Sequence, residues 1–329
     1  MFSKHRVGFC PALYYFNKNL RTPAYRRRVF LICALRGRAV YMNLSNPSEL
    51  KNIIETYGFS FSKGLGQNFL IDSGVLESIV DGSGVDAECG VLEIGPGAGT
   101  LTRALAARAK KVVAVEIDKK LMPLLGYTLN GIKNASVIND DILAVDLKAL
   151  AAREFKDMPF RVVANLPYYI TTPIIMKFLE EEIPVKSLTV MIQKEVAERM
   201  AASPGGKDYG ALSAAVQFYT KPRIICRAEP HCFIPQPKVA SVVIRLDVLE
   251  KPSVDVKDKD MFFRVIKSAF GQRRKTLVNA LSHSPYVKAE KADVISAVGA
   301  MGLDPSIRGE KLSLAEFARL TDILTGAAH

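Results

Sequence analysis

The 329-residue sequence lacks the features that mark several common classes of protein. Its longest early apolar run, residues 29–35, is far shorter than the ~20 residues of a transmembrane helix, so we expect no membrane partner. Its five cysteines are odd in number and show no metal-ligand spacing, so we expect neither a disulfide framework nor a metal site. A reduced, cytoplasmic compartment is the simpler interpretation. Low-complexity tracts and internal repeats are absent from the sequence as well.

Acidic residues are missing from the first 41 positions, and this changes the meaning of the net charge. Residues 1–41 hold nine Lys or Arg and no Asp or Glu. Removing these nine from the 45 basic residues leaves 36, against 33 acidic ones, so the formal charge of +12 is mostly local. The segment has three interpretations: a mitochondrial-type presequence, a basic RNA-touching tail, or upstream sequence that is not normally translated before Met42. We favour the last, and we expect a protein that starts at Met42 to fold and act normally.

The segment from Asn165 to Tyr169 follows a buried-strand pattern at residues 160–164. In open α/β sheets, ligands bind at the carboxyl ends of the strands. There, the Asn165 side-chain oxygen and the Leu166 carbonyl could accept both N–H groups of an adenine amine, exposing its lone pair. Pro167 would fix the turn without adding a donor, and Tyr168 would stack on the base. An ordinary strand-to-loop turn is the alternative for these residues taken alone.

A glycine-rich turn follows the strand pattern at residues 91–94 and leads into a helix pattern. Glycines such as Gly95 and Gly97 allow positive φ and let the backbone approach a ligand closely. The next strand pattern ends at Glu116, where an acid is placed to bind both hydroxyls of a ribose. This order of strand, glycine turn, helix, strand and acid predicts a nucleotide-type ligand.

The spacing of the turn distinguishes between ligands. Dinucleotide enzymes use G-x-G-x-x-G, whereas here Gly95, Gly97 and Gly99 are closer together and follow Glu93. An acid beside the turn repels a pyrophosphate but suits an ammonium or sulfonium group. The pattern therefore favours S-adenosylmethionine over NAD.

Three further segments could complete such a site. Asp141 could accept the amino group of the cofactor's adenine, while Ile117 and Ile142 flank its ring. Gln67 and Asn68, in a Gly-rich and aromatic segment, could hydrogen-bond a small molecule as a lid. Each segment taken alone is also typical of a solvated surface loop.

The last third of the chain adds an aromatic residue and a basic run. Phe233, in a Pro-stiffened loop, could form a second aromatic wall of a base pocket opposite Tyr168, or could be a core residue. Beyond residue 252 the pattern is helical. There the cations Arg273, Arg274 and Lys275 open a helix, which fits phosphate contacts with RNA, although a solvated charged face is the commoner meaning of such a run.

Taken together, residues from about 42 to the end resemble the bacterial small-subunit ribosomal RNA adenine dimethyltransferases, the kasugamycin-sensitivity family. The resemblance is carried by several short motifs spread along the chain: Gly66-Gln67-Asn68-Phe69-Leu70, Glu93 to Gly99, Val115 to Asp118, Asp141, Asn165 to Tyr168, Tyr209 to Ser213, Phe233 to Val239, and Gln272 to Leu277. Ala240 departs from the pattern, since relatives often carry Asp there. Each motif is unspecific, but the set is highly specific.

The resemblance implies a class I methyltransferase fold, an α/β fold with a Rossmann-like seven-stranded sheet, followed by a small helical domain. We expect a catalytic domain at residues 42–250 and an RNA-binding domain at 251–329. The implied reaction is dimethylation of two adjacent adenosines near the 3′ end of 16S rRNA in an assembling small subunit, by a monomer. Asn68, Leu70 and Asn165 join the implied cofactor site, and no metal is implied.

Two other classes of function remain open at this point. A non-catalytic assembly factor or mitochondrial transcription factor could keep the fold, although the intact Asn165, Asp141 and glycine set argues against lost catalysis. A methyltransferase of 23S rRNA could share the pocket, although the long helical tail resembles the small-subunit family better. A dehydrogenase is a distant third, because the glycine spacing is wrong and none of the four histidines is convincingly catalytic.

Overall fold

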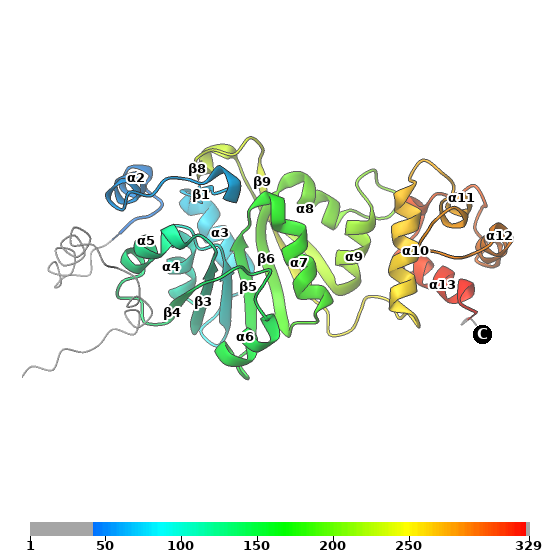
Figure 1. The fold of residues 1–329 in the computed structure, drawn as a ribbon, viewed down its shortest axis with the longest axis horizontal. Helices are drawn as coiled ribbons and strands as arrows, with labels where there is room; N and C mark the ends of the chain where they lie inside the picture. The colour runs from blue at the N-terminus through cyan, green and yellow to red at the C-terminus, as the bar shows by residue number, and fades with distance from the viewer. Residues whose placement is uncertain (1–41, 327–329) are drawn as a thin grey trace, which may run out of the picture.

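The computed structural model describes residues 42–326, so the interpretation of residues 1–41 lies outside the described residues. A seven-stranded sheet, in the order β4-β3-β2-β5-β6-β9-β7, forms the centre of the molecule and confirms the expected α/β class (Figure 1). Its strands are β2 (Gly90–Ile94), β3 (Lys111–Glu116), β4 (Ala135–Asn139), β5 (Phe160–Asn165), β6 (Val185–Gln193), β7 (Thr220–Ala228) and β9 (Ser241–Val248).

The first five of these strands run parallel, while β9 pairs antiparallel with both β6 and β7. The chain enters the sheet at β2, which lies between β3 and β5. The strand order therefore reverses at β2, and parallel sheets bind ligands in the crevice at such a reversal. The segments that follow β2, β3 and β5 consequently meet at one edge of the sheet.

Successive strand residues point to opposite faces of the sheet, and each face is covered by helices. Leu92 packs in a cluster with residues of α6 (Leu147–Glu154), α7 (Thr171–Glu180), α8 (Lys194–Ala201) and α9 (Ala211–Tyr219). Its neighbour Val91 packs in a separate cluster with α3 (Ser73–Ser83) and α4 (Thr100–Ala106). Both residues are at most 2% exposed, so the continuous apolar run of β2 is explained by burial on both faces.

A third apolar cluster lies near the carboxyl ends of the parallel strands. It joins α2 (Pro47–Thr56), α5 (Met122–Thr128) and the ring of Phe69. Phe69 belongs to β1 (Phe69–Leu70), which pairs antiparallel with β8 (Phe233–Ile234) in a separate two-stranded sheet. The lid segment before β1 is therefore held beside the loop that leads into β9.

The described part of the chain beyond β9 contains helices joined by loops and no strand, as the sequence pattern predicts. Its helices are α10 (Lys259–Gly271), α11 (Leu277–Ser282), α12 (Lys291–Ala300) and α13 (Leu314–Leu324). Short 3₁₀ turns within residues 42–326 are η2 (Lys63–Leu65), η3 (Lys119–Leu121), η4 (Tyr168–Ile170), η5 (Pro230–Cys232) and η6 (Gly309–Lys311). Phe262 of α10 packs on Phe218 of α9, with ring centroids 5.2 Å apart. The helices thus share an apolar core with the sheet, and their independence as a domain stays a prediction.

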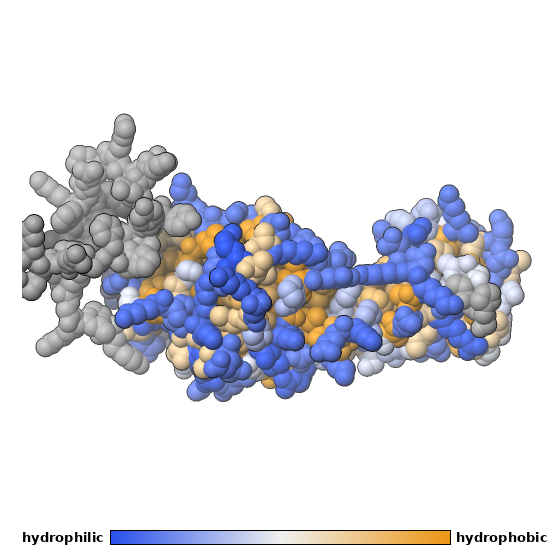
Figure 2. Space-filling view, turned by 90° about the horizontal axis from the view of Figure 1, so that it is seen from below, coloured by the Kyte–Doolittle hydropathy of each residue, from blue (hydrophilic) through white to orange (hydrophobic). Residues whose placement is uncertain are grey.

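In the ribbon view, the helices beyond α9 extend the molecule away from the sheet, with α10 lying between α9 and the remaining helices (Figure 1). Seen from below, polar side chains cover most of the surface, and apolar residues show between them (Figure 2). No helix in residues 42–326 is both long enough and apolar enough to cross a membrane.

Candidate active site

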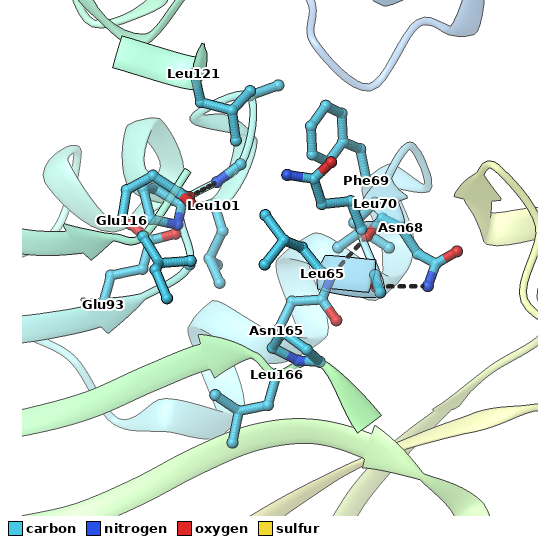
Figure 3. A pocket seen from close by; sticks show the side chains of 18 of the residues that line it. Leu65, Asn68, Phe69, Leu70, Glu93, Leu101, Glu116, Leu121, Asn165 and Leu166 are labelled. Atoms are coloured by element: carbon cyan, nitrogen blue, oxygen red, sulfur yellow. Dashed lines mark hydrogen bonds between the residues drawn. The ribbon is translucent and has the colours of Figure 1, made fainter. Parts of the chain in front are cut away.

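A cavity lies where the segments after β2, β3 and β5 meet. Its lining comes from four stretches, within residues 65–70, 93–101, 116–121 and 165–170. Figure 3 shows Glu93 and Glu116 on one side of this cavity, and Asn165 with Asn68 on the other. Three groups that the sequence predicts in separate roles therefore share one pocket: the glycine turn, the acid after β3 and the segment after β5.

The glycines of the turn differ in what they leave room for. Gly95 and Gly97 have φ values of +69° and +58°, which side chains rarely adopt. A Cβ on Gly95 would meet nothing nearer than the Asn165 carbonyl oxygen at 4.0 Å. A Cβ on Gly97 would lie 2.9 Å from the ring of Phe69. Gly95 thus leaves an open cradle for a ligand, whereas Gly97 lets the lid pack on the turn.

Two carboxylates are buried beside the turn. Glu93 is 1% exposed, and burial, with a smaller contribution from the Glu116 carboxylate, raises its pKa to about 8. Burial also raises the pKa of Glu116, which is 4% exposed. Oε2 of Glu93 has no hydrogen-bond partner among the described residues. A cationic ligand in the cavity would offset the free-energy cost of burying this carboxyl group.

Glu116 is held by the backbone around it. Its Oε1 accepts a hydrogen bond from the Asp118 amide at 2.7 Å, and its Oε2 accepts one from the Gly97 amide at 3.3 Å. Each carboxylate oxygen can accept a second bond, so both remain available to hydroxyl groups. The side chain therefore ties the glycine turn to the end of β3 and faces the cavity.

The lid is fastened by Gln67. Its Nε2 donates to Oδ2 of Asp118 at 2.7 Å, and its Oε1 accepts from the Ser62 amide at 2.8 Å. Gln67 also lines the cavity, and after these two bonds its amide keeps one N–H group and one oxygen lone pair, so its contact with the small molecule stays a prediction. Asn68 and Leu70 do line the cavity, and Asn68 donates from Nδ2 to the Gly66 carbonyl at 3.0 Å.

Asn165 is oriented by the same lid. Its Nδ2 donates to the Asn68 carbonyl at 2.9 Å, while its Oδ1 has no hydrogen-bond partner within residues 42–326 (Figure 3). The Leu166 amide donates to the Met191 carbonyl at 3.1 Å, so the backbone after β5 is tied to β6. The side-chain orientation agrees with the predicted acceptor role, although the role itself stays a prediction.

Tyr168 and Pro167 also line the cavity. Tyr168 is half-buried, and its hydroxyl shares a hydrogen bond of 2.8 Å with Oγ of Ser241. Burial raises the pKa of Tyr168, so the phenol remains neutral at physiological pH. The sequence pattern singles out the segment that holds Tyr169 but predicts no role for Tyr169 or for Ser241, although both are polar or aromatic residues in or next to the motifs.

Phe233 lies elsewhere. Its ring is 1% exposed and packs in the cluster of α3 and α4, because β8 pairs with β1 and places Phe233 opposite Leu70. The expectation of a second aromatic wall opposite Tyr168 is therefore corrected: in this structure Phe233 is a core residue.

Only one of the three residues that the sequence predicts to contact the cofactor's adenine lies at the cavity. Ile117 lines the cavity and is 49% exposed, whereas Asp141 and Ile142 are not part of the lining. These two residues follow β4, and Oδ1 of Asp141 accepts from the Leu143 amide at 2.9 Å. β4 is the outermost strand on that side, so the residues lie at the same edge of the sheet but beyond the cavity wall.

The three cations of the basic turn between α10 and α11 have different surroundings. Arg273 pairs with Glu310 at 3.0 Å and donates to the Lys207 carbonyl at 2.8 Å, so it joins the turn to η6 and to the loop before α9. Arg274 and Lys275 are exposed, and no ion pair within residues 42–326 involves them. The predicted phosphate contact therefore rests mainly on Arg274 and Lys275. No cluster of metal-ligating residues is found in the described part of the chain.

Comparison with known proteins agrees with this arrangement. The family model described as ribosomal RNA adenine dimethylase matches residues 58–325. The protein named ribosomal RNA small subunit methyltransferase A from Alkaliphilus oremlandii is 53% identical over 281 residues, covering 85% of this chain and 98% of the relative. A relative of the same name from Geobacillus thermodenitrificans is 50% identical over 287 residues, covering 87% and 98%.

Solved structures show the same fold. A dimethyladenosine transferase from Plasmodium falciparum superposes with a TM-score of 0.64 at 27% identity, covering 77% of this chain and 95% of that one. The 23S rRNA methyltransferase ErmE gives a TM-score of 0.61 at 26% identity, covering 78% and 100%.

Proposed function

Since the chain belongs to the ribosomal RNA adenine dimethylase family, we propose that it dimethylates the N6 amino groups of two adjacent adenosines near the 3′ end of 16S rRNA. It is an rRNA adenine dimethyltransferase, and S-adenosylmethionine is the methyl donor that the family implies. The observation that carries the proposal is the orientation of Asn165, whose side-chain oxygen has no partner among the described residues and lies beside a cavity built from the glycine turn and two buried acids.

The residues of the cavity suit this donor. Gly95 leaves an open cradle beside the turn, Oε2 of Glu93 lacks a partner, and Glu116 faces the cavity with acceptor capacity for ribose hydroxyls. When bound, the donor supplies a methyl group on a positively charged sulfur. We propose that Asn68, Leu70, Gly95, Gly97, Glu116 and Ile117 hold it, and that Asp141 and Ile142 contact its adenine from beyond the described cavity wall.

The chain then has to present the target amine. We propose that Oδ1 of Asn165 and the Leu166 carbonyl accept its two N–H groups, which draws the nitrogen lone pair out of conjugation with the ring. With the donor bound, the nitrogen would form a bond to the methyl carbon while the sulfur leaves with the electron pair of the carbon–sulfur bond, and the methylated amine would release its proton to water. This reaction needs little acid–base chemistry, so positioning supplies most of the rate. Removing the base from its stack costs a few kcal/mol, which stacking on Tyr168 offsets.

We also propose that the RNA is methylated in an assembling small subunit, by a monomer in the cytoplasm. Relatives named for the small ribosomal subunit and the exposed cations Arg274 and Lys275 support this choice.

Primer extension tests the proposal. Reverse transcription should stop at the two adenosines in small-subunit RNA from the normal strain and read through in a strain that lacks the gene. A plasmid copy should restore the stop, whereas a copy with Asn165→Ala should not. Stops that persist in the deletion strain, or lost stops in 23S rRNA instead, would overturn it.

A further inference from the structure

Two consecutive tyrosines line the cavity in different ways. Tyr168 is half-buried, and its hydroxyl is bonded to Ser241. Tyr169 exposes 55% of its surface, although it belongs to the lining of the same cavity. Within residues 42–326, the side chain of Tyr169 has no hydrogen-bond partner and no aromatic ring stacked on it. An aromatic face is therefore left open to solvent at the rim of the site.

The backbone around Tyr169 limits how far the ring can move. The residue lies in η4, which leads directly into α7. On the other side, a Cβ on Gly66 would lie 3.6 Å from Cδ1 and Cε1 of the ring and 3.7 Å from Cβ of Pro167. The lid therefore lies against one edge of the Tyr169 ring, so the ring is partly ordered before RNA binds.

An ordered and exposed ring at this rim suits a second base. Moving one adenine out of its stack into the cavity leaves the adjacent base without a stacking partner on one face. Proteins that bind unpaired nucleotides cover such faces with aromatic side chains. We propose that Tyr169 stacks on the nucleobase next to the one in the cavity and so sets the position of the substrate. This inference rests on the proposed function, and it makes Tyr169 a positioning residue.

Kinetics on small-subunit particles from a strain that lacks the gene test the inference. Tyr169→Ala should raise the KM for particles by roughly 5- to 150-fold, the range for losing one base–aromatic stack. The value of kcat, the affinity for S-adenosylmethionine and the melting temperature should stay near normal. Tyr169→Phe should restore the KM because it keeps the ring, whereas Tyr169→Leu should not.

A fluorescent base gives an independent readout. 2-Aminopurine placed next to the target adenosine in a synthetic hairpin should be quenched by the normal protein and by Tyr169→Phe, but not by Tyr169→Ala. A normal KM and normal quenching in Tyr169→Ala would overturn the inference. Weaker binding of S-adenosylmethionine to Tyr169→Ala would also overturn the inference, because the ring would then act by packing on the lid of the cofactor cavity. If the normal protein itself fails to methylate the particles, the proposed function fails instead.

Discussion

The carboxyl edge of the sheet and the C-terminal helices treat their charged groups in opposite ways. At the sheet edge, Glu93 and Glu116 are 1% and 4% exposed, and burial raises the pKa of both. Beside the C-terminal helices, the side chains of Arg273 and Glu310 are 40% and 24% exposed and compensate each other. One region buries carboxyl groups that form no ion pair among the described residues, and the other pairs opposite charges close to solvent.

This difference separates binding from architecture. A buried carboxylate without a partner lowers stability, so it is expected where a ligand brings the opposite charge. A pair near the surface costs little and contributes little, and it mainly joins segments together. Substitutions at the sheet edge should therefore alter ligand-dependent quantities, whereas substitutions of the paired charge should alter the docking of the helices.

The largest effect is expected from Asn165→Ala. Loss of one preorganised hydrogen bond in the transition state typically costs about 10²–10³ in turnover. The variant also loses the bond from Nδ2 to the Asn68 carbonyl, a neutral hydrogen bond worth only about 1 kcal/mol of stability. Single-turnover methylation should therefore fall severely, while calorimetry shows nearly normal affinity for S-adenosylmethionine.

Asn165→Asp is the comparison variant, because it keeps acceptor oxygens while it loses the donor to the Asn68 carbonyl and adds a negative charge. It should retain more of the rate than the Ala variant. If Asn165→Ala instead lowers the melting temperature and the cofactor affinity together with the rate, Asn165 has a core role. Normal turnover in that variant would remove it from the reaction altogether.

Glu116→Ala should have the next largest effect. Losing hydrogen bonds to a charged group should weaken S-adenosylmethionine binding by about 1–3 kcal/mol. Glu88→Ala removes an exposed carboxylate from a surface pair with Lys110 and should leave the affinity unchanged. Titration calorimetry on both variants makes the comparison, and equal affinities, or tight NAD binding to the normal protein, would contradict the assigned site.

Glu93 gives the sheet edge a pH dependence of definite sign. Its carboxyl has a pKa of about 8 in the folded protein, against an ordinary value of 4.5. Between these values the folded state keeps a proton that the unfolded state has lost. The free energy of unfolding of the ligand-free protein should therefore fall as pH rises through this window, by at most about 1.4 kcal/mol per pH unit.

Glu93→Gln, which mimics the protonated form, should remove this part of the pH dependence. Urea unfolding at pH 6 and pH 8 measures it in both proteins. The normal protein should lose more stability than the variant over that interval. Identical slopes would mean that Glu93 is ionised throughout, with compensation from a group not yet identified.

The positions of the strand-end residues could be predicted because parallel strands leave little freedom. Once residues 91–94, 111–116 and 160–164 are assigned to neighbouring parallel strands, Gly95, Glu116 and Asn165 must emerge at one edge. The pattern of apolar residues predicts where the strands lie, and the shared direction of the strands predicts that their terminal residues meet at one site. Neither step requires knowledge of distant contacts.

The partners of long polar side chains could not be predicted in this way. The sequence pattern suggests Gln67 as a ligand-binding residue, but its side chain pairs with Asp118, which is 51 positions away. An amide or guanidinium has the same chemistry toward a ligand as toward a protein carboxylate. Only the tertiary structure decides which it meets, and the same reason explains why Arg273 turns toward Glu310.

The smallest effect is expected from the exposed cations of the basic turn, and it separates them from Arg273. Arg274→Ala with Lys275→Ala should reduce the salt slope of RNA binding by about 0.7–0.9 for each phosphate that the protein no longer neutralises. The melting temperature and cofactor affinity should not change. Arg273→Ala should instead lower the melting temperature slightly, because it removes the ties to Glu310 and the Lys207 carbonyl. Binding titrations over a range of salt concentrations measure the slopes.

A normal slope in the double variant would leave Arg274 and Lys275 as a solvated face. A lower melting temperature in that variant would mean that they help to dock the helices, as Arg273 does.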